Sequence, residues 1–259
     1  MLSHSCREQG DVPESRMSRR EQAKAGRRSR IVAAAHNLIS EAGVDALSMK
    51  QVAERAGVSL STVYNLFDSK EAVLTQVFVD TFVLYRELVF ERASNDPFEL
   101  LFESVDIAAE FYEAEPAFYR SMVWLVGKES AVKLTIQQPR LEFYADMVQR
   151  TIDADLLRPG TEPRLVAALI SPLYSLAYQL WAAGTASIDE FCIRAKFGML
   201  VALKAFARPE ALPTFDALAQ PLESWLVAQL GVSRARRGIV PLQRLRDARG
   251  EAVAAMADS

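Results

Sequence analysis

Side chains that can form directional hydrogen bonds are concentrated between residues 60 and 65. Ser61, Thr62, Tyr64 and Asn65 place hydroxyl, phenol and amide groups in one short segment beside Leu60. An amide can pair with the edge of adenine, hydroxyls can bond phosphates or bases, and a leucine offers only apolar contact, for instance to a thymine methyl. These residue types could contact DNA if a helix presents them to a groove, and Asn65 is then the candidate for a directional base contact.

Groups that could support catalysis are scarce. The two histidines are His4 and His36, and His36 is predicted on the exposed side of a helix. The two cysteines, Cys6 and Cys192, are too few for a disulfide framework or a thiolate metal cage. No nucleophile elbow, phosphate loop or metal-ligand spacing is present. We expect no catalytic residue, metal site or cofactor, although catalysis by carboxylates alone stays open as the enzyme alternative.

A helix, a glycine turn and a second helix position the hydrogen-bonding segment. Ser48 can cap a helix that continues to about Ala56, Gly57 ends it, and Ser59 can cap a third helix of about seven residues. Two helices crossing on such a turn let the second enter a major groove about 12 Å wide. Their shared core is predicted to be Val52, Ala53, Val58, Val63 and Phe67. On spacing alone, a plain structural corner is the alternative to this helix-turn-helix.

The flanking helices are predicted from the same kind of pattern. The helix before the motif buries a face made of Ile31, Ala34, Ala35, Leu38, Ile39 and Ala42. Gly43 is expected to end it in a left-handed conformation. A fourth helix opens at Asp68-Ser69, where Asp68 and Glu71 form a possible capping box, and fades near residues 94–97.

Charge is distributed unevenly along the chain, whose net charge is −3. Residues 93–230 carry 11 Lys and Arg against 18 Asp and Glu. Near the amino terminus, a single acid, Glu21, lies among a basic set: Arg16, Arg19, Arg20, Lys24, Arg27, Arg28 and Arg30. Because charges act over roughly 10 Å in salt, an acidic body does not exclude a basic DNA-binding face.

The apolar runs are too short for the roughly 20 residues that cross a bilayer, and the first 20 residues lack the apolar core of a secretory signal. We therefore expect no membrane association and a cytoplasmic location. Met17 heads a stretch that suits the DNA-binding module better than what precedes it. Translation from Met17 instead of Met1 is a hypothesis that the intact mass of the native product tests.

The sequence resembles the tetracycline-repressor-like (TetR) transcriptional regulators. The resemblance rests on Ala42-Gly43 followed by Ser48, on Val52-Ala53 with Ala56-Gly57-Val58-Ser59, and on Thr62-Val63-Tyr64-x-x-Phe67-x-Ser69-Lys70-Glu71-x-x-Leu74. These motifs cover under a fifth of the chain. The sequence departs from the family pattern at Leu60 and Leu66, where polar or basic residues are commoner, so base preference is expected to rest on few hydrogen bonds.

The resemblance implies roles for individual residues. Tyr64 and Lys70 would contact phosphates, and Thr62 the backbone or a base. Residues 60, 61 and 65 would read base edges, while the arm around Arg27 and Arg28 would follow the backbone or minor groove. The predicted DNA-binding set is Arg27, Arg28, Ser48, Lys50, Leu60, Ser61, Thr62, Tyr64, Asn65 and Lys70. Simple packing is the alternative for Tyr64.

Two long helices are predicted at residues 162–183 and 187–207, and the second carries a stripe of small residues: Ala195, Gly198, Ala202 and Ala205. The resemblance implies a homodimer through a four-helix bundle formed by these two helices of each subunit, and hence a nearly palindromic operator. Packing of the stripe inside one subunit is the alternative.

Aromatic residues gather in the same part of the chain, where Pro172 is expected to disturb a helix. They predict an apolar cavity for a small apolar or amphipathic effector, with these candidate ligand-binding residues: Phe111, Tyr112, Trp124, Tyr144, Tyr174, Tyr178 and Trp181. Ordinary core packing is the alternative for each. By family analogy, the effector would act through the fourth helix and shift the two helix-turn-helix units of a dimer relative to each other.

An acidic stripe, Glu99, Glu103, Asp106, Glu110 and Glu113, is typical of a solvated helix face, with binding of a cationic ligand as the alternative. The predicted organisation is all-α: a disordered basic arm (1–26), a helix-turn-helix domain (27–74), a helical effector-binding and dimerisation domain (75–230) and a flexible tail (231–259). A DNA-binding repressor is the favoured function. Repression follows only from the family's habits, and an architectural DNA-binding protein without an effector is an alternative.

Overall fold

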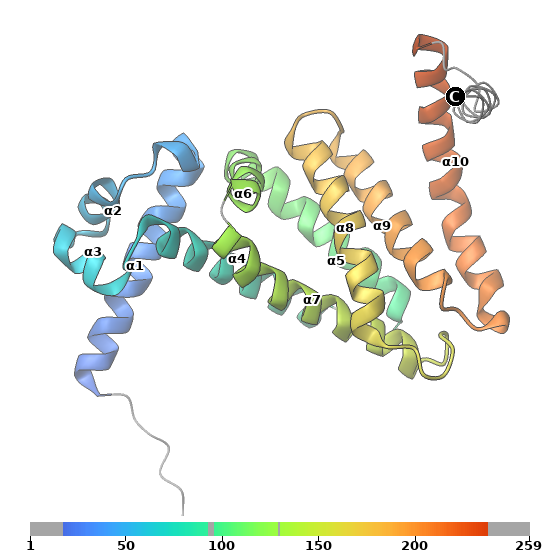
Figure 1. Ribbon diagram of the computed structural model, residues 1–259, viewed down its shortest axis with the longest axis horizontal. Coiled ribbons are helices and arrows are strands. Elements are labelled where there is room, and N and C mark those ends of the chain that lie inside the picture. The colour runs from blue at the N-terminus through green and yellow to red at the C-terminus, as the bar shows by residue number, and fades with distance from the viewer. Residues whose placement is uncertain (1–17, 93–95, 129, 238–259) are drawn as a thin grey trace, which may run out of the picture.

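The computed structural model describes residues 18–92, 96–128 and 130–237, with side chains described except for residues 124–136 and 231–237. This part of the chain is all-α, as predicted (Figure 1). Its α-helices are α1 (Arg19–Ala42), α2 (Met49–Ala56), α3 (Leu60–Leu66), α4 (Lys70–Arg92), α5 (Pro97–Ala114), α6 (Pro116–Lys128), α7 (Ser130–Asp153), α8 (Pro163–Ala182), α9 (Ile188–Lys204) and α10 (Leu212–Arg237). Short 3₁₀ turns occupy Val44–Ala46 and Pro209–Ala211.

The first three helices and the start of α4 enclose a small core of their own. Ile31 and Ile39 of α1, Val52 of α2 and Val63 of α3 are fully buried in it, and Val77 of α4 closes it. Phe118 and Met122 of α6 also reach this core, so the amino-terminal unit rests on the larger body.

Helix α1 begins earlier than the sequence indicated. Ser18 accepts a hydrogen bond from the Glu21 amide while the Glu21 carboxylate accepts one from the Ser18 amide, which is a complete capping box. This cap, followed by good helix formers, makes residues 19–26 helical. The prediction of a disordered arm reaching residue 26 was therefore wrong for residues 19–26, and residues 1–17 lie outside the described residues.

Two further boundaries differ from the predicted ones. Ser69, rather than Asp68, caps α4, because its hydroxyl accepts from the Ala72 amide at 3.1 Å. At the other end, α10 extends to Arg237, beyond the predicted end of the domain at residue 230, and residues 238–259 lie outside the described residues.

The two glycine stops behave differently. Gly57 adopts the left-handed helical conformation with φ 64° and ψ 41°, as a carboxyl-terminal cap of α2. Gly43 also has a positive φ of 80°, but its ψ of 168° makes it an extended corner rather than the predicted left-handed cap. Both positions favour glycine because a Cβ is disfavoured at positive φ.

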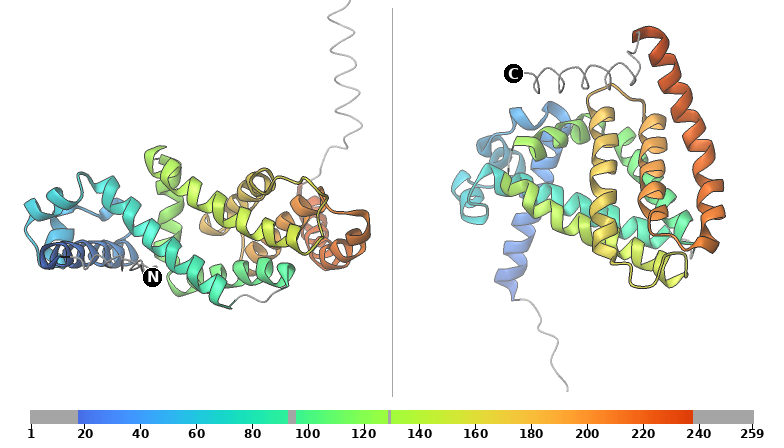
Figure 2. Two further views of the ribbon diagram at one scale, coloured as in Figure 1. Left: turned by 90° about the horizontal axis from the view of Figure 1, so that it is seen from below. Right: turned by 45° about the vertical axis from the view of Figure 1, so that its right-hand side comes forward.

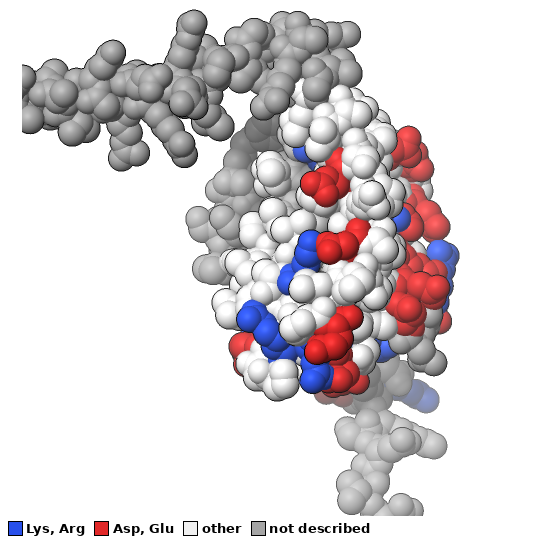
Figure 3. Space-filling model, turned by 90° about the vertical axis from the view of Figure 1, so that its right-hand side faces the viewer, with Lys and Arg blue, Asp and Glu red and all other residues white. Residues whose placement is uncertain are grey.

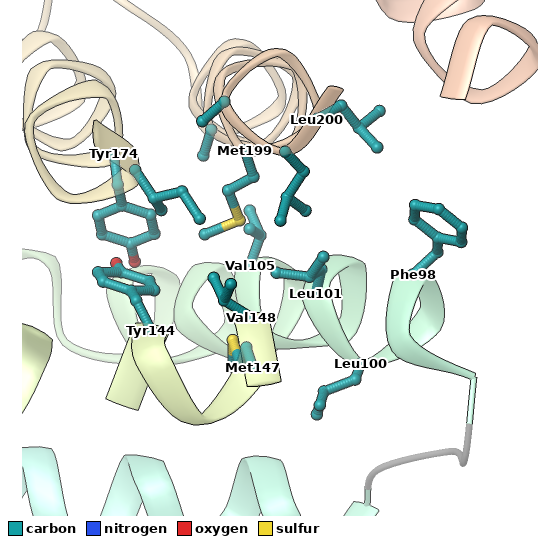
Figure 4. Close-up of a cluster of buried hydrophobic side chains, with 14 of the residues drawn as sticks. Phe98, Leu100, Leu101, Val105, Tyr144, Met147, Val148, Tyr174, Met199 and Leu200 are labelled. Atoms are coloured by element: carbon teal, nitrogen blue, oxygen red, sulfur yellow. The ribbon is translucent and has the colours of Figure 1, made fainter. Parts of the chain in front are cut away.

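The larger body surrounds a second core. Side chains from α5, α7, α8 and α9 meet there, including Leu101, Val148 and Met199 (Figure 4). Helices α4 and α7 run side by side, and so do α8 and α9, with α10 along the outer side of α9 (Figures 1 and 2). The only β feature in the described part of the chain is an isolated bridge between Leu157 and Ala207.

Helix α8 is long and apolar enough, by length and composition, to cross a membrane, and it is the one such helix among the described residues. Its inner face, which includes Ile170, Ala177 and Trp181, is buried in the core. Its outer face carries four exposed leucines, Leu165, Leu169, Leu173 and Leu176. The helix is thus a core helix with a second, uncovered apolar side.

Candidate DNA interface and effector cavity

Helix α3 divides its side chains between the core and the solvent as predicted. Val63 is fully buried and Phe67, directly after the helix, is 2 % exposed. Leu60 and Tyr64 are 42 % and 49 % exposed, and Asn65 also faces solvent. The opposite side of α3 packs against the core. Its exposed leucine and tyrosine are therefore available to contact another molecule.

The turn before α3 fixes the start of this helix. The Ser59 hydroxyl accepts from the Thr62 amide at 3.1 Å, which is the predicted cap. It also lies 2.8 Å from the Thr62 hydroxyl and 2.9 Å from that of Ser61. The Val58 amide donates to the Ala53 carbonyl at 3.0 Å and thereby closes the turn.

Arg28 does not point away from the protein as a free DNA ligand. Its Nη1 donates to the Leu66 carbonyl at 2.8 Å, and its Nη2 donates to Gln76 Oε1 at 3.0 Å. The guanidinium lies 4.1 Å from the centre of the Phe67 ring. These donors join α1 to α3 and α4, and contact of Arg28 with the DNA backbone stays a prediction.

Other predicted DNA-binding residues lie around α3 at the same end of the molecule. Lys50 is exposed, and Ser48 caps α2 through a capping box with Gln51. Lys70 is half-buried, and its Nζ donates to the Val44 carbonyl at 3.2 Å. Arg27 is half-buried as well. Their contacts with DNA stay predictions.

The amino-terminal turns of α1 extend past α2 and α3 (Figure 1). Arg19, Arg20, Lys24 and Arg30 are exposed on this part of the helix. By contrast, the side of the molecule that carries α10 is mostly uncharged, with acidic side chains along one edge (Figure 3). Positive charge thus accompanies the helix-turn-helix on a rigid helical extension instead of a disordered arm.

The acidic stripe of α5 is largely solvent-facing, in agreement with the simpler interpretation. Asp106 pairs with Lys196 at 2.6 Å, and Glu110 pairs with Arg92 at 3.1 Å. These ion pairs join α5 to α9 and α4. Within the described residues, no group of three or more potential metal ligands is present.

An aromatic cavity of about 80 Å³ lies inside the larger body where α4 to α8 meet. Its lining is Phe78, Thr81, Phe82, Tyr85, Ala108, Phe111, Tyr112, Phe118, Tyr119, Met122, Arg140, Tyr144, Tyr174 and Tyr178. Five of the seven predicted ligand-binding residues are among them. Trp181 lies behind the wall, stacked on Tyr112 with ring centres 5.0 Å apart. The side chain of Trp124 lies outside the described residues.

Tyrosine hydroxyls supply most of the polar atoms of the lining. The hydroxyls of Tyr112 and Tyr174 lie 2.9 Å apart, and that of Tyr85 donates to the Ser104 carbonyl at 2.8 Å. The Tyr178 hydroxyl donates to the carbonyl of Tyr119. Burial raises the pKa of each of these buried phenols, so they stay neutral donors at physiological pH.

The sequence reasoning missed Arg140, which projects into this wall from α7. Burial acts to lower the pKa of its guanidinium, but its hydrogen bond to Tyr144 acts in the opposite direction, and the pKa is raised. Arg140 is therefore a permanent cation. Its position directly after Pro139, outside any apolar periodicity, gave no signal that it faces inward.

The contribution of α4 to the cavity follows from its length. Phe78, Thr81 and Phe82 line the cavity, while Val77 and Val73, one and two turns before Thr81, belong to the core of the DNA-binding unit. One continuous helix thus touches both sites. The predicted route from effector to DNA through the fourth helix would run along this helix, and it stays a prediction.

A second connection joins α1 to α6. The His36 ring lies 4.3 Å from that of Phe118, and its Nε2 is 3.7 Å from Glu115 Oε2. The same carboxylate oxygen accepts from the Ser40 hydroxyl at 2.6 Å. His36 is half-buried in this junction, so the prediction that it sits on an exposed face was wrong.

The small-residue stripe of α9 faces its own subunit. Ala195 is fully buried and Ala202 nearly so, and a Cβ on Gly198 would lie 3.0 Å from the Leu173 Cβ. Only Ala205 is exposed. The stripe therefore allows the close approach of α8 and α9 within one chain, which was the alternative interpretation, and its assignment to dimerisation is corrected for these three residues.

Comparison with known proteins agrees with this architecture. Residues 31–77 match the family model described as bacterial regulatory proteins, tetR family. The HTH-type transcriptional repressor KstR2 of Rhodococcus jostii (strain RHA1) is 34 % identical over 70 residues, which are 26 % of this chain and 34 % of that protein. The match thus spans about a third of the relative's length.

Two solved structures share the fold over most of both chains. A TetR transcriptional regulator from Rhodococcus sp. RHA1 has a TM-score of 0.59 at 20 % identity, covering 70 % of this chain and 97 % of that one. Thermus thermophilus FadR, a TetR-family repressor in complex with lauroyl-CoA, has a TM-score of 0.58 at 22 % identity, covering 68 % and 93 %. Residues 31–77 thus match the helix-turn-helix domain of the tetR family of bacterial regulatory proteins, and the described part of the chain has a fold similar to that of these solved regulators.

Proposed function

We propose that this protein is a transcriptional repressor that binds a palindromic operator as a homodimer and is released by a small amphipathic effector. The observation that carries the proposal is α3, whose exposed Leu60, Tyr64 and Asn65 stand on a helix fixed from behind by Val63 and Phe67. Such a helix fits the major groove, and the exposed cations of α1 can neutralise phosphates. The protein would act in the cytoplasm, where the chromosome lies.

Dimerisation is supported by the uncovered face of α8 and α9. The exposed leucines of α8 continue onto α9 at Val201, which is 46 % exposed, and at Ala205. An apolar face of two adjacent helices is stabilised when a second copy covers it as a four-helix bundle. A two-fold dimer would then place its two α3 helices on half-sites separated by about 34–36 Å or a multiple of it.

Effector binding is supported by the cavity and by α4. The cavity of about 80 Å³ is smaller than the roughly 150 Å³ that accommodates benzene, so an effector enters only if lining side chains move. Movement of Phe78 or Phe82 displaces α4, which also forms the core behind α3. The lauroyl-CoA complex of FadR makes an acyl-bearing molecule a reasonable class to test.

The decisive experiment measures binding to the DNA that flanks the protein's own gene and to random DNA of equal length. Fluorescence anisotropy over several salt concentrations separates specific from purely electrostatic binding. We expect the flanking DNA to bind at least about a thousandfold more tightly than random DNA. Equal affinities would overturn the regulator function and favour the architectural alternative.

A further inference from the structure

Arg140 holds a permanent positive charge in the wall of the aromatic cavity. Its Nη2 donates to the Ser175 hydroxyl at 3.0 Å, and its guanidinium lies 5.9 Å from the centre of the Tyr174 ring. Tyr144 is a further hydrogen-bond partner. Tyr144 and Tyr174 face each other from α7 and α8, with ring centres 5.9 Å apart (Figure 4).

The partners of Arg140 among the described side chains are neutral. Ser175 is uncharged, and the phenols of Tyr112, Tyr144 and Tyr174 remain protonated because burial raises the pKa of each. Among the ion pairs of the described residues, several arginines of the larger body reach a carboxylate, such as Arg86 with Asp146 and Arg92 with Glu110, but Arg140 does not. The cavity therefore carries a positive charge that its own lining leaves uncompensated.

Arg140 is half-buried, and a charge that is partly withdrawn from water without a counter-ion is stabilised when an anion joins it. The guanidinium is planar and matches the two oxygens of a carboxylate. A single cation balances one unit of negative charge, which fits a carboxylate better than a doubly charged phosphate. The remainder of the lining is aromatic and methyl-bearing, for example Phe82, Phe111 and Met122, so it suits a hydrocarbon body.

We propose that the effector is a monocarboxylate with an apolar body, whose carboxylate pairs with Arg140 inside the cavity. In the hydrogen bond between the Tyr112 and Tyr174 hydroxyls one hydroxyl uses its proton, so the other, which accepts, can donate its own to the second carboxylate oxygen. This inference deepens the proposed function. It rests on that function for the release from DNA, whereas binding of the monocarboxylate at Arg140 does not depend on it.

The test compares acids with alcohols of the same shape, using the full-length protein without DNA. Octanoate is paired with octan-1-ol, and 3-phenylpropanoate with 3-phenylpropan-1-ol, at pH 7.5 with binding measured by calorimetry. Because a hydrogen bond to a charged partner contributes about 1.5–3 kcal/mol, each acid should bind about ten- to a hundredfold more tightly than its alcohol. Octanoyl-CoA, whose acyl group is neutral and whose phosphates are charged, is a third arm.

Variants assign the preference to one residue. Arg140→Met should reduce the preference for acid over alcohol to less than about threefold, while Arg140→Lys should keep part of it because the charge remains. Arg150→Met is the matched control, since Arg150 is an exposed arginine of the same helix. If Arg140→Met fails to fold, as circular dichroism would show, the comparison of acids with alcohols on the unaltered protein decides.

The possible outcomes distinguish failure of the carboxylate site from failure of the proposed effector-controlled repression. Equal binding of acids and alcohols, absence of acid binding, or a preference for octanoyl-CoA over octanoate overturns the carboxylate inference. Acid binding that depends on Arg140 but leaves operator affinity unchanged supports the carboxylate site and overturns effector-controlled repression.

Discussion

Arg28 of α1 donates a hydrogen bond from Nη1 to the carbonyl oxygen of Leu66, the last residue of α3, over 2.8 Å. The last carbonyls of a helix have no partner inside the helix, and a cation there also complements the helix dipole. The same guanidinium covers the Phe67 ring. A helix of seven residues is unstable alone, so this contact helps to hold α3 in the orientation that DNA binding requires.

Arg28→Met should lower the free energy of unfolding by about 1–3 kcal/mol, because it leaves the Leu66 carbonyl without its donor. Affinity for the operator should fall as α3 loosens, with little change in the dependence of affinity on salt. Urea unfolding and anisotropy titrations measure the two effects. Arg30→Met, at an exposed position, is the control and should leave stability nearly unchanged. Normal stability of Arg28→Met with a reduced salt dependence would show that Arg28 contacts a phosphate instead.

Asn65→Ala should relax discrimination at one base position by about 1–3 kcal/mol, since an exposed amide on α3 can pair with a single adenine edge. Tyr64→Phe is the informative partner, because the loss of an exposed phenol hydroxyl should weaken binding to all sequences alike. Binding to a set of operators with single base-pair changes measures both. A uniform loss for Asn65→Ala on specific and random DNA would contradict its role in base reading.

Leu169→Glu should convert the proposed dimer to a monomer. Leu169 is 43 % exposed in the middle of the apolar row of α8, and an unpaired carboxylate inside a helix bundle is strongly disfavoured. Operator affinity should fall in parallel, because one DNA-binding unit can contact only one half-site. Analytical ultracentrifugation gives the mass. Leu84→Glu, at a 57 % exposed leucine of α4, introduces the same charge elsewhere and should leave the dimer intact. A Leu169→Glu dimer would place the interface on another face.

The thiol of Cys192 provides a prediction about pH. Burial raises its pKa to about 11, with a smaller contribution from Asp106. Since only the thiolate reacts, alkylation by iodoacetamide at pH 8 should be slower than for an ordinary cysteine by about two orders of magnitude. The rate should rise steadily with pH up to about 11. A Cys6→Ser variant isolates the signal in mass spectrometry, and fast labelling at pH 8 would contradict the buried environment.

Features specified by neighbouring residues could be predicted from the sequence, and features that join distant residues could not. The caps Ser48 and Ser59 and the stop at Gly57 act within one turn of the chain, so their spacing was sufficient. Arg28 and Leu66 are 38 positions apart in the sequence. The pattern of a basic segment does not show whether an arginine bonds a distant helix of its own chain or contacts DNA.

The candidate cavity shows the same division. Periodicity located Tyr174 and Tyr178 on one face of a helix, and that face does line the cavity. Arg140 is charged, and a charge is normally assigned to the surface. The stripe at Ala195 and Gly198 correctly indicated close helix packing, but spacing alone does not say whether the partner helix belongs to the same chain.

The contact between His36 and Phe118 links the DNA-binding unit to the cavity, since Phe118 lies in the lining and His36 on α1. His36→Ala should therefore weaken the communication between the two sites. We expect the ratio of operator affinities without and with octanoate to shrink by an amount equivalent to about 0.5–2 kcal/mol. Asn37→Ala, at the adjacent exposed position, is the control and should keep the ratio.

Two titrations isolate this coupling from simple loss of binding. Octanoate affinity is measured on the free protein, and operator affinity is measured without octanoate. Both should change less than the ratio, because His36 is neither in the cavity lining nor on the exposed side of α3. An unchanged ratio in His36→Ala would leave α4, through Phe78 and Phe82, as the path between effector and DNA. A ratio near one in this variant would make the junction of α1 and α6 the main path.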